Sequence, residues 1–440
     1  MVAEVEETKR KADGENNASD VKSIKMDPAV CLTEDFNSDL LRIYYEHLFP
    51  FKLMHRWLNY RHSSKIASER DFFLRREFTF VLSGDIYCRY QCFRDENAYR
   101  AAVIAQQPVR MEIGAVYTHP PKNHKSVVKE AYQPVERELV FDIDMDDYDD
   151  IRTCCTGAKL CPKCWTFMKA AIKTLRRALE EDFGFEHLLF VFSGRRGVHC
   201  WVCDKVARQL PNEQRSALAD YLTVVASGAK KSRAEVKLNG CNEAHPSILA
   251  AYKILEPYFK DDPNGVLKGQ DILRKGDHLD RITCTFTTQE RDELAKWVAA
   301  NPNKTSSEIW KQMENLQAER ESSAPTYKHK ADAKMMLKDV VLQYTYPRLD
   351  VNVSKQMNHL LKSPFVVHPK TGRVCVPIDP DKVDQFDPLA VPTVGQLATQ
   401  PTDVRQTSLH EYVHYFETGF VQPLERALLK AGASAESLEW

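Results

Sequence analysis

The sequence predicts a mixed α/β protein, and two observations lead to this class. Short segments with strand character flank a segment whose apolar residues recur every three or four positions, as in an amphipathic helix. From about Lys205 to Lys338, helical segments and charged loops replace this pattern, and strand character returns after Tyr346. We therefore expect an α/β core that is interrupted by a helical part.

The elements of the expected core follow one another along the chain. Residues 76–93 alternate apolar and polar side chains around Ser-Gly-Asp, which is typical of a β-hairpin. Residues 166–183 predict an amphipathic helix, and Gly184 stands where its C-cap would lie. Further strands are expected at 138–144, 187–193 and 198–204.

The domain organisation follows from these shifts in pattern. The first residues are polar and almost free of aromatic side chains, which predicts a disordered tail. Residues 322–334, SSAPTYKHKADAK, are expected to form a mobile connection. The expected parts are a tail at 1–28, a first core segment at 29–204 with a cysteine motif at 154–164, a helical insertion at 205–338, a second core segment at 339–400 and a C-terminal helical segment at 401–440.

Composition excludes several classes of protein. The chain has 440 residues, 43% of them hydrophobic and 28% charged, as in an ordinary globular protein. No run of about eighteen apolar residues predicts a membrane span, and the charged N-terminus lacks the apolar stretch of a secretory signal. The twelve cysteines are therefore expected to be thiols or metal ligands in a reducing compartment. A net charge of −1 means that nucleic acid would have to be held by local basic patches.

The stretch ELVFDIDMDDYDD (138–150) contains a candidate metal site. Side chains two apart on a strand share a face, so Asp142 and Asp144 are expected to project together while Phe141 and Ile143 pack on the other side. With no arginine beside them, the two acids need a cation, and carboxylates suit Mg²⁺ or Mn²⁺. The alternative is a solvated acidic loop. That interpretation is expected to hold for Asp146, Asp147, Asp149 and Asp150.

Four cysteines lie within eleven residues, shortly after these acids. Cys154, Cys155, Cys161 and Cys164 are enough for a closed tetrahedral Zn²⁺ site. The CPKC half is a good zinc knuckle, whereas adjacent cysteines are less usual; four buried thiols are the alternative. A site with four thiolates leaves no open position, so the zinc is expected to be structural.

Two further stretches carry groups that suit phosphates. FSGRRGVHCW (192–201) places Ser193, Arg195, Arg196, Gly197 and His199 at a turn between strands, where arginines and backbone N–H groups can bind phosphate oxygens. A tight hairpin with exposed arginines is the alternative.

The second stretch, RLDVNVSKQMNHLLKSPFVVHPKTGR (348–373), adds a third acid, Asp350, followed by cations. It predicts a short helix capped by Asn352 or Ser354, and a surface helix with ordinary lysines is the alternative interpretation. The basic residues and histidines that follow the acid are Lys355, His359, Lys362, His368, Lys370 and Arg373.

Taken in order, these motifs resemble the small, catalytic subunit of eukaryotic and archaeal DNA primases. The resemblance extends from about Arg76 through Asp379 and rests on ELVFDIDMDDYDD, CCTGAKLCPKCW, SGRRGVHCWVCD and YPRLDVNVSKQMNHLLKSPFVVHPKTGR. It implies a mixed α/β catalytic core with a helical subdomain and a zinc-binding excursion.

The resemblance also implies roles for individual residues. Asp142, Asp144 and Asp350 would hold the catalytic Mg²⁺ or Mn²⁺ ions, and Glu77 would be counted with the catalytic acids. Glu112 stands where relatives carry aspartate, which leaves its role open. The residues implied for the nucleotide are Tyr87 and Arg89 on the sugar side, and Ser193, Arg195, Arg196, Gly197, His199, His359, Lys362 and His368.

The function implied is template-directed synthesis of RNA primers on single-stranded DNA from ribonucleoside triphosphates. The implied partners are a primase large subunit and the catalytic and accessory subunits of DNA polymerase α, in the nucleus. Two alternatives stay open at this point: a primase-polymerase that extends DNA in repair, and a non-catalytic zinc adaptor that binds nucleic acid.

Overall fold

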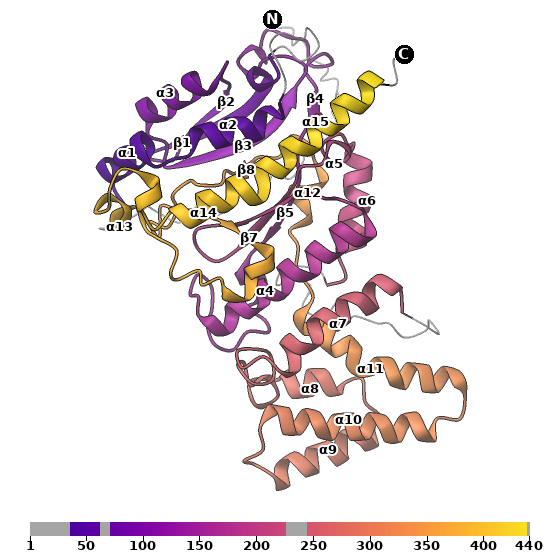
Figure 1. The fold of residues 1–440 in the computed structure, drawn as a ribbon. Coiled ribbons are helices and arrows are strands. Elements are labelled where there is room, and N and C mark those ends of the chain that lie inside the picture. The colour runs from indigo at the N-terminus through magenta and orange to yellow at the C-terminus, as the bar shows by residue number, and fades with distance from the viewer. Residues whose placement is uncertain (1–35, 62–70, 226–243, 438–440) are drawn as a thin grey trace, which may run out of the picture.

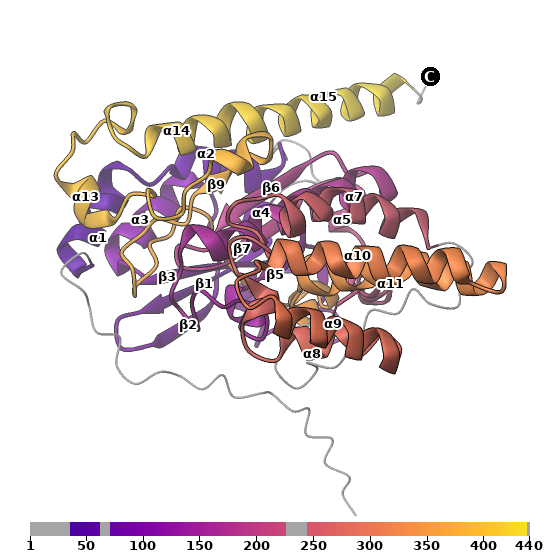
Figure 2. The ribbon, with the colours of Figure 1, turned by 90° about the horizontal axis from the view of Figure 1, so that it is seen from below.

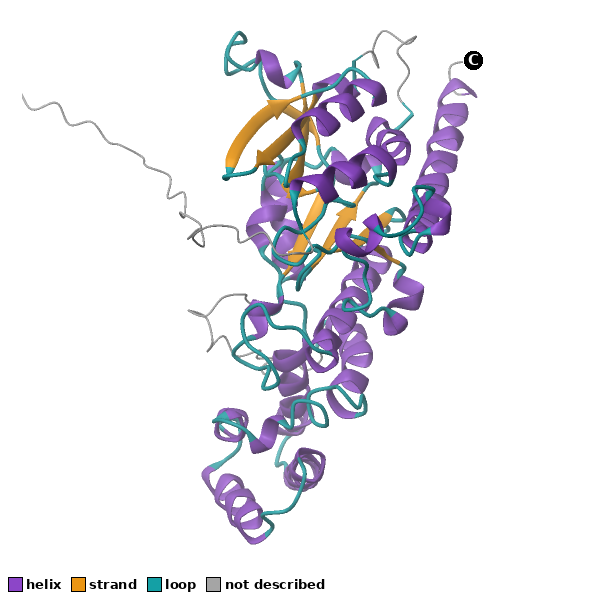
Figure 3. Cartoon of the chain, turned by 90° about the vertical axis from the view of Figure 1, so that its left-hand side faces the viewer, coloured by secondary structure: helices purple, strands orange, loops and turns teal. Residues whose placement is uncertain are grey.

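A computed structural model describes residues 36–61, 71–225 and 244–437. The expected tail at 1–28 lies outside the described residues. The structure confirms a mixed fold, with two antiparallel sheets in one part of the molecule and a lobe of helices in the other (Figures 1 and 3).

The first sheet has the strand order β2-β1-β3-β4, with β8 also paired to β3. Its strands are β1 (Arg76–Leu82), β2 (Ile86–Gln91), β3 (Arg110–Tyr117), β4 (Pro134–Glu136) and β8 (Leu361–Lys362). Phe78 and Phe80 share one face, and helices α1 (Ser38–His47), α2 (Phe51–Asn59) and α3 (Glu96–Gln106) lie on that side. The opposite face is largely polar. The β1–β2 pair confirms the hairpin expected at 76–93.

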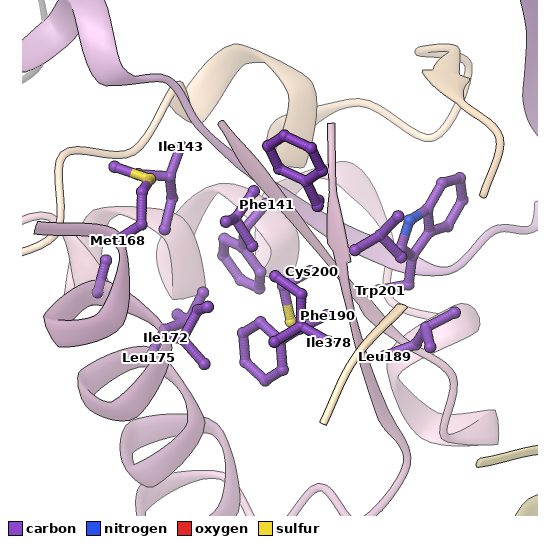
Figure 4. Close-up of a cluster of buried hydrophobic side chains, with 14 of the residues drawn as sticks. Phe141, Ile143, Met168, Ile172, Leu175, Leu189, Phe190, Cys200, Trp201 and Ile378 are labelled. Atoms are coloured by element: carbon purple, nitrogen blue, oxygen red, sulfur yellow. The ribbon is translucent and has the colours of Figure 1, made fainter. Parts of the chain in front are cut away.

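The second sheet has the order β5-β7-β6-β9 and carries the acid motif. Its strands are β5 (Leu139–Ile143), β6 (Leu188–Phe192), β7 (Val198–Val202) and β9 (Pro377–Ile378). Figure 4 shows Phe141, Phe190 and Cys200 on the face that meets Met168 and Ile172 of helix α4 (Pro162–Arg177). The strand expectations are confirmed. The helix begins four residues before the expected position 166 and ends at Arg177; a π-helical turn, Ala178–Asp182, continues it almost to Gly184, which has a φ of 70°.

The helical lobe contains α7 (Pro246–Lys260), α8 (His278–Thr283), α9 (Thr288–Ala300), α10 (Ser306–Ser323) and α11 (Tyr327–Thr345) (Figure 1). The prediction of a mobile connection at 322–334 is wrong, because only residues 324–326 separate α10 from α11. The Thr326 side chain caps α11 by accepting from the N–H of His329. Lysine and alanine are good helix formers, so the charged stretch continues the helix.

The remaining helices pack on the sheets. Arg215 of α6 donates to the carbonyl oxygens of Arg137 and Glu138, which fixes α6 to the start of β5. Seen from below, α15 runs along the sheet region rather than the lobe (Figure 2). No described helix is long and apolar enough to cross a membrane. These helices are α5 (Lys205–Arg208), α6 (Asn212–Leu222), α12 (Val351–Lys355), α13 (Val394–Ala398), α14 (His410–Tyr415) and α15 (Gln422–Ser437).

Short irregular helical segments complete the described chain. The 3₁₀ turns are Phe73–Arg75, Pro121–Asn123, Met145–Tyr148, Ile272–Arg274, Pro380–Gln385 and Val404–Gln406, and π-helical turns occupy Ala178–Asp182 and Phe416–Val421.

Candidate metal and nucleotide site

Strand β5 presents the first acid on the face opposite to its own apolar side chains. Phe141 and Ile143 are almost fully buried against α4, so Asp142 between them points to the other face of the sheet. Asp144 follows the strand and begins the turn Met145–Tyr148. The structure therefore places the two acids as the pattern predicts.

Neighbouring segments bring a histidine and a third acid to Asp142. His199 is the cross-strand partner of Asp142 on β7, and its Nε2 lies 3.6 Å from Asp142 Oδ1. The backbone N–H of Asp350 donates to the carbonyl of Asp142 at 3.0 Å, although the two residues lie 208 positions apart in the sequence. Asp350 itself caps the N-terminus of α12 by accepting a hydrogen bond from the N–H of Asn352. The prediction that Asn352 or Ser354 caps this helix is therefore wrong.

The acids repel one another. Burial and the charges of Asp144 and Asp350 together raise the pKa of Asp142 to about 7, although Lys362 lowers it. Burial and the charges of Asp146, Asp144 and Asp350 raise the pKa of Asp147 to about 7. Oxygen ligands with uncompensated negative charge are what Mg²⁺ or Mn²⁺ requires. The residues that could hold such ions are Asp142, Asp144 and Asp350.

An arginine lies beside Asp142 and Asp144. The sequence analysis expected no arginine there, and that expectation is wrong. The Arg196 guanidinium donates to both carboxylate oxygens of Asp144, at 2.6 and 2.9 Å. It also lies 2.7 Å from a carboxylate oxygen of Asp146. Arg196 therefore supplies part of the positive charge that the acids require.

The expectation of a solvated loop for the acids beyond Asp144 holds in part: Asp146 and Asp149 are exposed, but Asp147 and Asp150 are half-buried, and two of the acids form ion pairs with buried arginines. Asp149 pairs with Arg152, whose side chain is fully buried, and Asp150 pairs with Arg348, whose side chain is 5% exposed. Arg348 also donates to the carbonyl of Asp147 at 2.5 Å. These ion pairs fix the turn that follows Asp142 and Asp144.

A cleft of about 250 Å³ collects most of the expected site residues. It brings acids together with basic groups and histidines. Its lining consists of Glu112, Asp142, Asp144, Ser193, Arg195, Arg196, Gly197, His199, Val353, His359, Leu360, Leu361, Lys362 and His368. Four expected residues, Glu77, Tyr87, Arg89 and Asp350, do not line it.

Lys362 joins the two sheets at this cleft. It is the cross-strand partner of Glu112 on β3, and its Nζ donates to the carbonyl of Ser193 at 3.4 Å. The Ser193 hydroxyl in turn accepts from the N–H of Gly197 at 3.0 Å. The β6–β7 turn and β8 thus present a lysine and backbone groups to the same space, which suits a phosphate chain.

The two most buried histidines of the cleft are neutral in the free protein. Burial, together with the charge of Lys362, lowers the pKa of His199 to about 3 and that of His368 to about 2. Burial also lowers the pKa of His359. The positive charge of the cleft therefore comes from the lysine and the arginines, while these imidazoles offer hydrogen bonds.

Two glycines of the turn are required by close packing. A Cβ at Gly197 would lie 2.5 Å from the carbonyl oxygen of Ile143, so only glycine lets the turn meet the end of β5. Gly194 has a φ of 82°, and a Cβ there would lie 2.7 Å from the Cβ of His368. Both contacts hold the turn against acids and histidines of the cleft.

Glu77, Arg89 and Tyr87 lie on the polar face of the first sheet. Glu77 is fully buried and accepts from Arg89 at 2.9 Å and from the Tyr117 hydroxyl at 3.2 Å. Tyr87 is 51% exposed and contacts Arg110. Sequence reasoning left the role of Glu112 open, and the structure brings this residue into the cleft. The alternation of apolar and other residues over 110–114 was the available signal for its strand.

The four cysteines converge although two of them are adjacent in the sequence. Their Sγ atoms all lie within 4.8 Å of one another, and those of Cys161 and Cys164 are 3.7 Å apart. Thiolates at about 2.3 Å from a tetrahedral ion are separated by about 3.8 Å, so the cluster fits a metal such as zinc. The side-chain amide of Gln270 donates to Cys154 Sγ at 3.3 Å. Hydrogen bonds of this kind commonly orient the side chains that ligate a metal.

Comparison with known proteins agrees with this site. The family model described as "DNA primase small subunit" matches residues 141–380. A "DNA primase small subunit" of Drosophila melanogaster is 40% identical over 363 residues, which cover 82% of this chain and 80% of that protein. The protein of the same name from Schizosaccharomyces pombe is 39% identical, with 82% and 77% covered.

Two more distant proteins are also similar. The "DNA primase small subunit PriS" of Halorubrum lacusprofundi is 27% identical, over 61% of this chain and 66% of that one. A solved structure titled "Polymerase Domain from Mycobacterium tuberculosis Ligase D in complex with DNA" aligns over 88% of this chain and 91% of that one, with a TM-score of 0.37 at 10% identity. That similarity is too low to carry an argument.

The site and the matched family define a nucleotidyltransferase-type enzyme, with clustered acids opposite a lysine and arginines. More narrowly, the chain belongs to the DNA primase small subunit family and is a catalytic primase subunit. The expectation from the sequence motifs is confirmed at this level.

Proposed function

We propose that this enzyme synthesises short RNA primers on a single-stranded DNA template from ribonucleoside triphosphates. The observation that carries the proposal is the convergence of Asp142, Asp144 and Asp350 beside a cleft that also contains Lys362 and Arg195. Acids alone would suit many metal sites. Acids opposite basic groups suit a metal–triphosphate substrate.

The three aspartates would hold two Mg²⁺ or Mn²⁺ ions. Such ions, when bound, activate the attacking 3′-hydroxyl and stabilise charge on the α-phosphate and the leaving pyrophosphate. The turn Ser193–Gly197 and Lys362 would orient the triphosphate, and His199 and His368 would add hydrogen bonds from neutral imidazoles. Phosphoryl transfer needs little beyond this positioning and charge stabilisation.

We propose that the cysteine cluster binds one structural Zn²⁺. All four thiolates would be used as ligands, which leaves no coordination site for substrate. Gln270 ties the cluster to the helical lobe, because its side chain also accepts from the N–H groups of Thr153 and Cys154. The metal would thus link the lobe to the loop that follows the catalytic acids.

Partners and compartment are proposed from the family. The relatives are named small subunits, which implies a second, larger subunit. A net charge of −1 supports reliance on that subunit for holding the template. We propose a heterodimer with the primase large subunit, association with the catalytic and accessory subunits of DNA polymerase α, and a nuclear location.

The test is primer synthesis on a poly-pyrimidine template, over a Mg²⁺ and Mn²⁺ series, with and without the large subunit. Asp142→Asn and Asp144→Asn should each lower incorporation of labelled ribonucleotides by about a hundredfold or more, as loss of an essential charge-stabilising group does. Asp384→Asn is the control, because Asp384 is an acid in an ion pair with Lys173 outside the cleft. Retained synthesis in the first two variants would contradict the metal assignment, and a preference for deoxynucleotides would favour a repair polymerase.

A further inference from the structure

A second and larger cleft, of about 590 Å³, lies between the start of α4 and the helical lobe. One wall is formed by Lys163, which lies between two of the clustered cysteines. The other walls are two loops of the lobe, residues 267–275 and 302–307. Nothing in the proposed mechanism uses this cleft.

The cleft is strongly basic. Its charged lining residues are Lys163, Lys268, Arg274, Lys275, Lys304 and Asp271. Lys304 pairs with Glu308 at 2.7 Å, and Asp271 accepts a hydrogen bond from the Ser306 hydroxyl at 2.7 Å. The other four cations have no carboxylate within 4 Å among the residues that the structure describes.

The hydrogen bonds that three of these four cations make do not neutralise their charge. Lys268 donates to the carbonyl of Asp261 at 2.7 Å, Arg274 donates to the carbonyl of Pro302, and Lys275 lies 3.4 Å from the Thr153 hydroxyl. These acceptors are uncharged. Cations that share one cleft repel one another, so an anion with several charges would be stabilised there.

The lining favours nucleic acid over an acidic peptide. None of the twelve lining residues is aromatic, and only Leu267 and Pro302 are apolar, so a peptide would find few anchors. Lysine and arginine without stacking partners suit a phosphate backbone that is held without regard to sequence. A template-directed enzyme needs such contacts.

The cleft has a fixed position relative to the catalytic acids. Gln270, which is fully buried between the lining residues Gly269 and Asp271, binds the backbone of Thr153 and Cys154. Arg281 donates to the carbonyl of Asp150 at 3.3 Å. The loop that bears the cations is therefore fastened to the segment that continues directly from Asp144.

We infer that this basic cleft binds the phosphodiester backbone of a nucleic-acid strand that extends from the catalytic site across the cysteine cluster. The inference rests on the proposed function, since it assigns the cleft to the strand on which that function acts. It adds a nucleic-acid contact that belongs to the helical lobe and lies outside the catalytic cleft.

The test compares two double variants of the full chain that remove the same charge. Lys268→Gln with Lys275→Gln alters the basic cleft, and Lys253→Gln with Lys296→Gln alters exposed lysines of the lobe that do not line it. Fluorescence anisotropy measures binding of a labelled single-stranded DNA and of a primed RNA–DNA duplex over a salt series. Melting temperatures verify that both proteins are folded.

We expect the first variant to bind at least one of these ligands about 5- to 30-fold more weakly at moderate salt. The slope of log K against log salt should become shallower by about 1.4, since each phosphate contact with a single strand contributes about 0.7. Lys268→Arg with Lys275→Arg should retain affinity. The ligand whose binding weakens more, the single-stranded DNA or the primed RNA–DNA duplex, identifies the nucleic acid that the basic cleft holds.

Three results would overturn the inference: equal losses in the two double variants, no loss in either, or loss of binding to a labelled polyglutamate peptide alone. Binding of a nucleoside triphosphate with Mn²⁺ should not change, because the catalytic cleft is intact. Failure of the proposed function would instead leave ribonucleotide incorporation unaffected by Asp142→Asn, so the two failures are distinguishable.

Discussion

Asp142→Asn should stabilise the metal-free protein while it abolishes catalysis. Burial and two neighbouring acids raise the pKa of Asp142 from 3.8 to about 7. Each pKa unit corresponds to about 1.4 kcal/mol, so the ionised carboxylate destabilises the folded state by at most about 4 kcal/mol. Its side chain is 29% exposed, and water therefore screens part of this effect. We expect a gain of about 1–3 kcal/mol at pH 8.

The sign of the pH dependence follows from proton binding. Between pH 3.8 and 7 the folded protein binds more protons at Asp142 than the unfolded chain does, so wild-type stability falls as pH rises through this window. The amide that Asp142→Asn introduces does not titrate. The advantage of the variant should therefore be small near pH 4, grow as the pH rises through 5 and 6, and be complete above about pH 7.

Thermal melting in EDTA from pH 5.5 to 8.5 measures this difference, which should reach about 1–3 °C for a chain of this length. Asp150→Asn is the matched control: it breaks a pair with the nearly buried Arg348 and should lower the melting temperature. Saturating Mn²⁺ should stabilise wild type and not Asp142→Asn. A variant that melts at or below wild type at pH 8 would refute the reasoning, as would a difference that does not change with pH.

Three further predictions concern other parts of the site. Gly197→Ala should lower ribonucleotide incorporation at least tenfold and the free energy of unfolding by about 1–3 kcal/mol, because the Cβ of the new alanine would displace the carbonyl of Ile143. Activity assays and thermal melting measure the two effects. Cys164→Ser should lose one equivalent of zinc by elemental analysis and melt at lower temperature, whereas retained zinc would contradict the assignment. Arg196→Gln should destabilise the protein in EDTA more than in Mn²⁺, since the ion then supplies the charge; an equal loss in both conditions would argue against this.

Much of the site could be predicted because its signals are local. The two-residue period of a strand is enough to place the Asp142 side chain on the other face of the sheet from Phe141. Four cysteines within eleven residues are enough to suggest the ligands of a structural metal. The contacts between distant segments carried no such signal. Arg196 reaches Asp144 only because β7 pairs with β5, and Asp350 reaches β5 through a backbone hydrogen bond.

Two charged stretches differ from what the sequence predicts, for different physical reasons. The turn after β5 was expected to be solvated, yet Arg152, three residues along the chain, pairs with Asp149, and Arg348 from a distant segment pairs with Asp150. Density of charge predicts exposure only when no opposite charge folds against it. The stretch after Ser323 is exposed over residues 325–330, but it continues as a capped helix rather than a mobile connection.

Metal and triphosphate should bind to this site cooperatively. Without ligands, burial and the charges of Asp144 and Asp350 raise the pKa of Asp142, and burial and the charges of Lys362 and Arg195 lower the pKa of His368. The acids thus lack a cation, and the basic groups lack an anion. A metal ion would supply the first charge and a triphosphate the second, and each ligand carries the charge that attracts the other. The coupling is reciprocal by necessity. Manganese affinity, measured by titration calorimetry, should therefore rise at least about fivefold in the presence of a non-hydrolysable nucleotide, and equal affinities would show that the acids and the basic groups act independently.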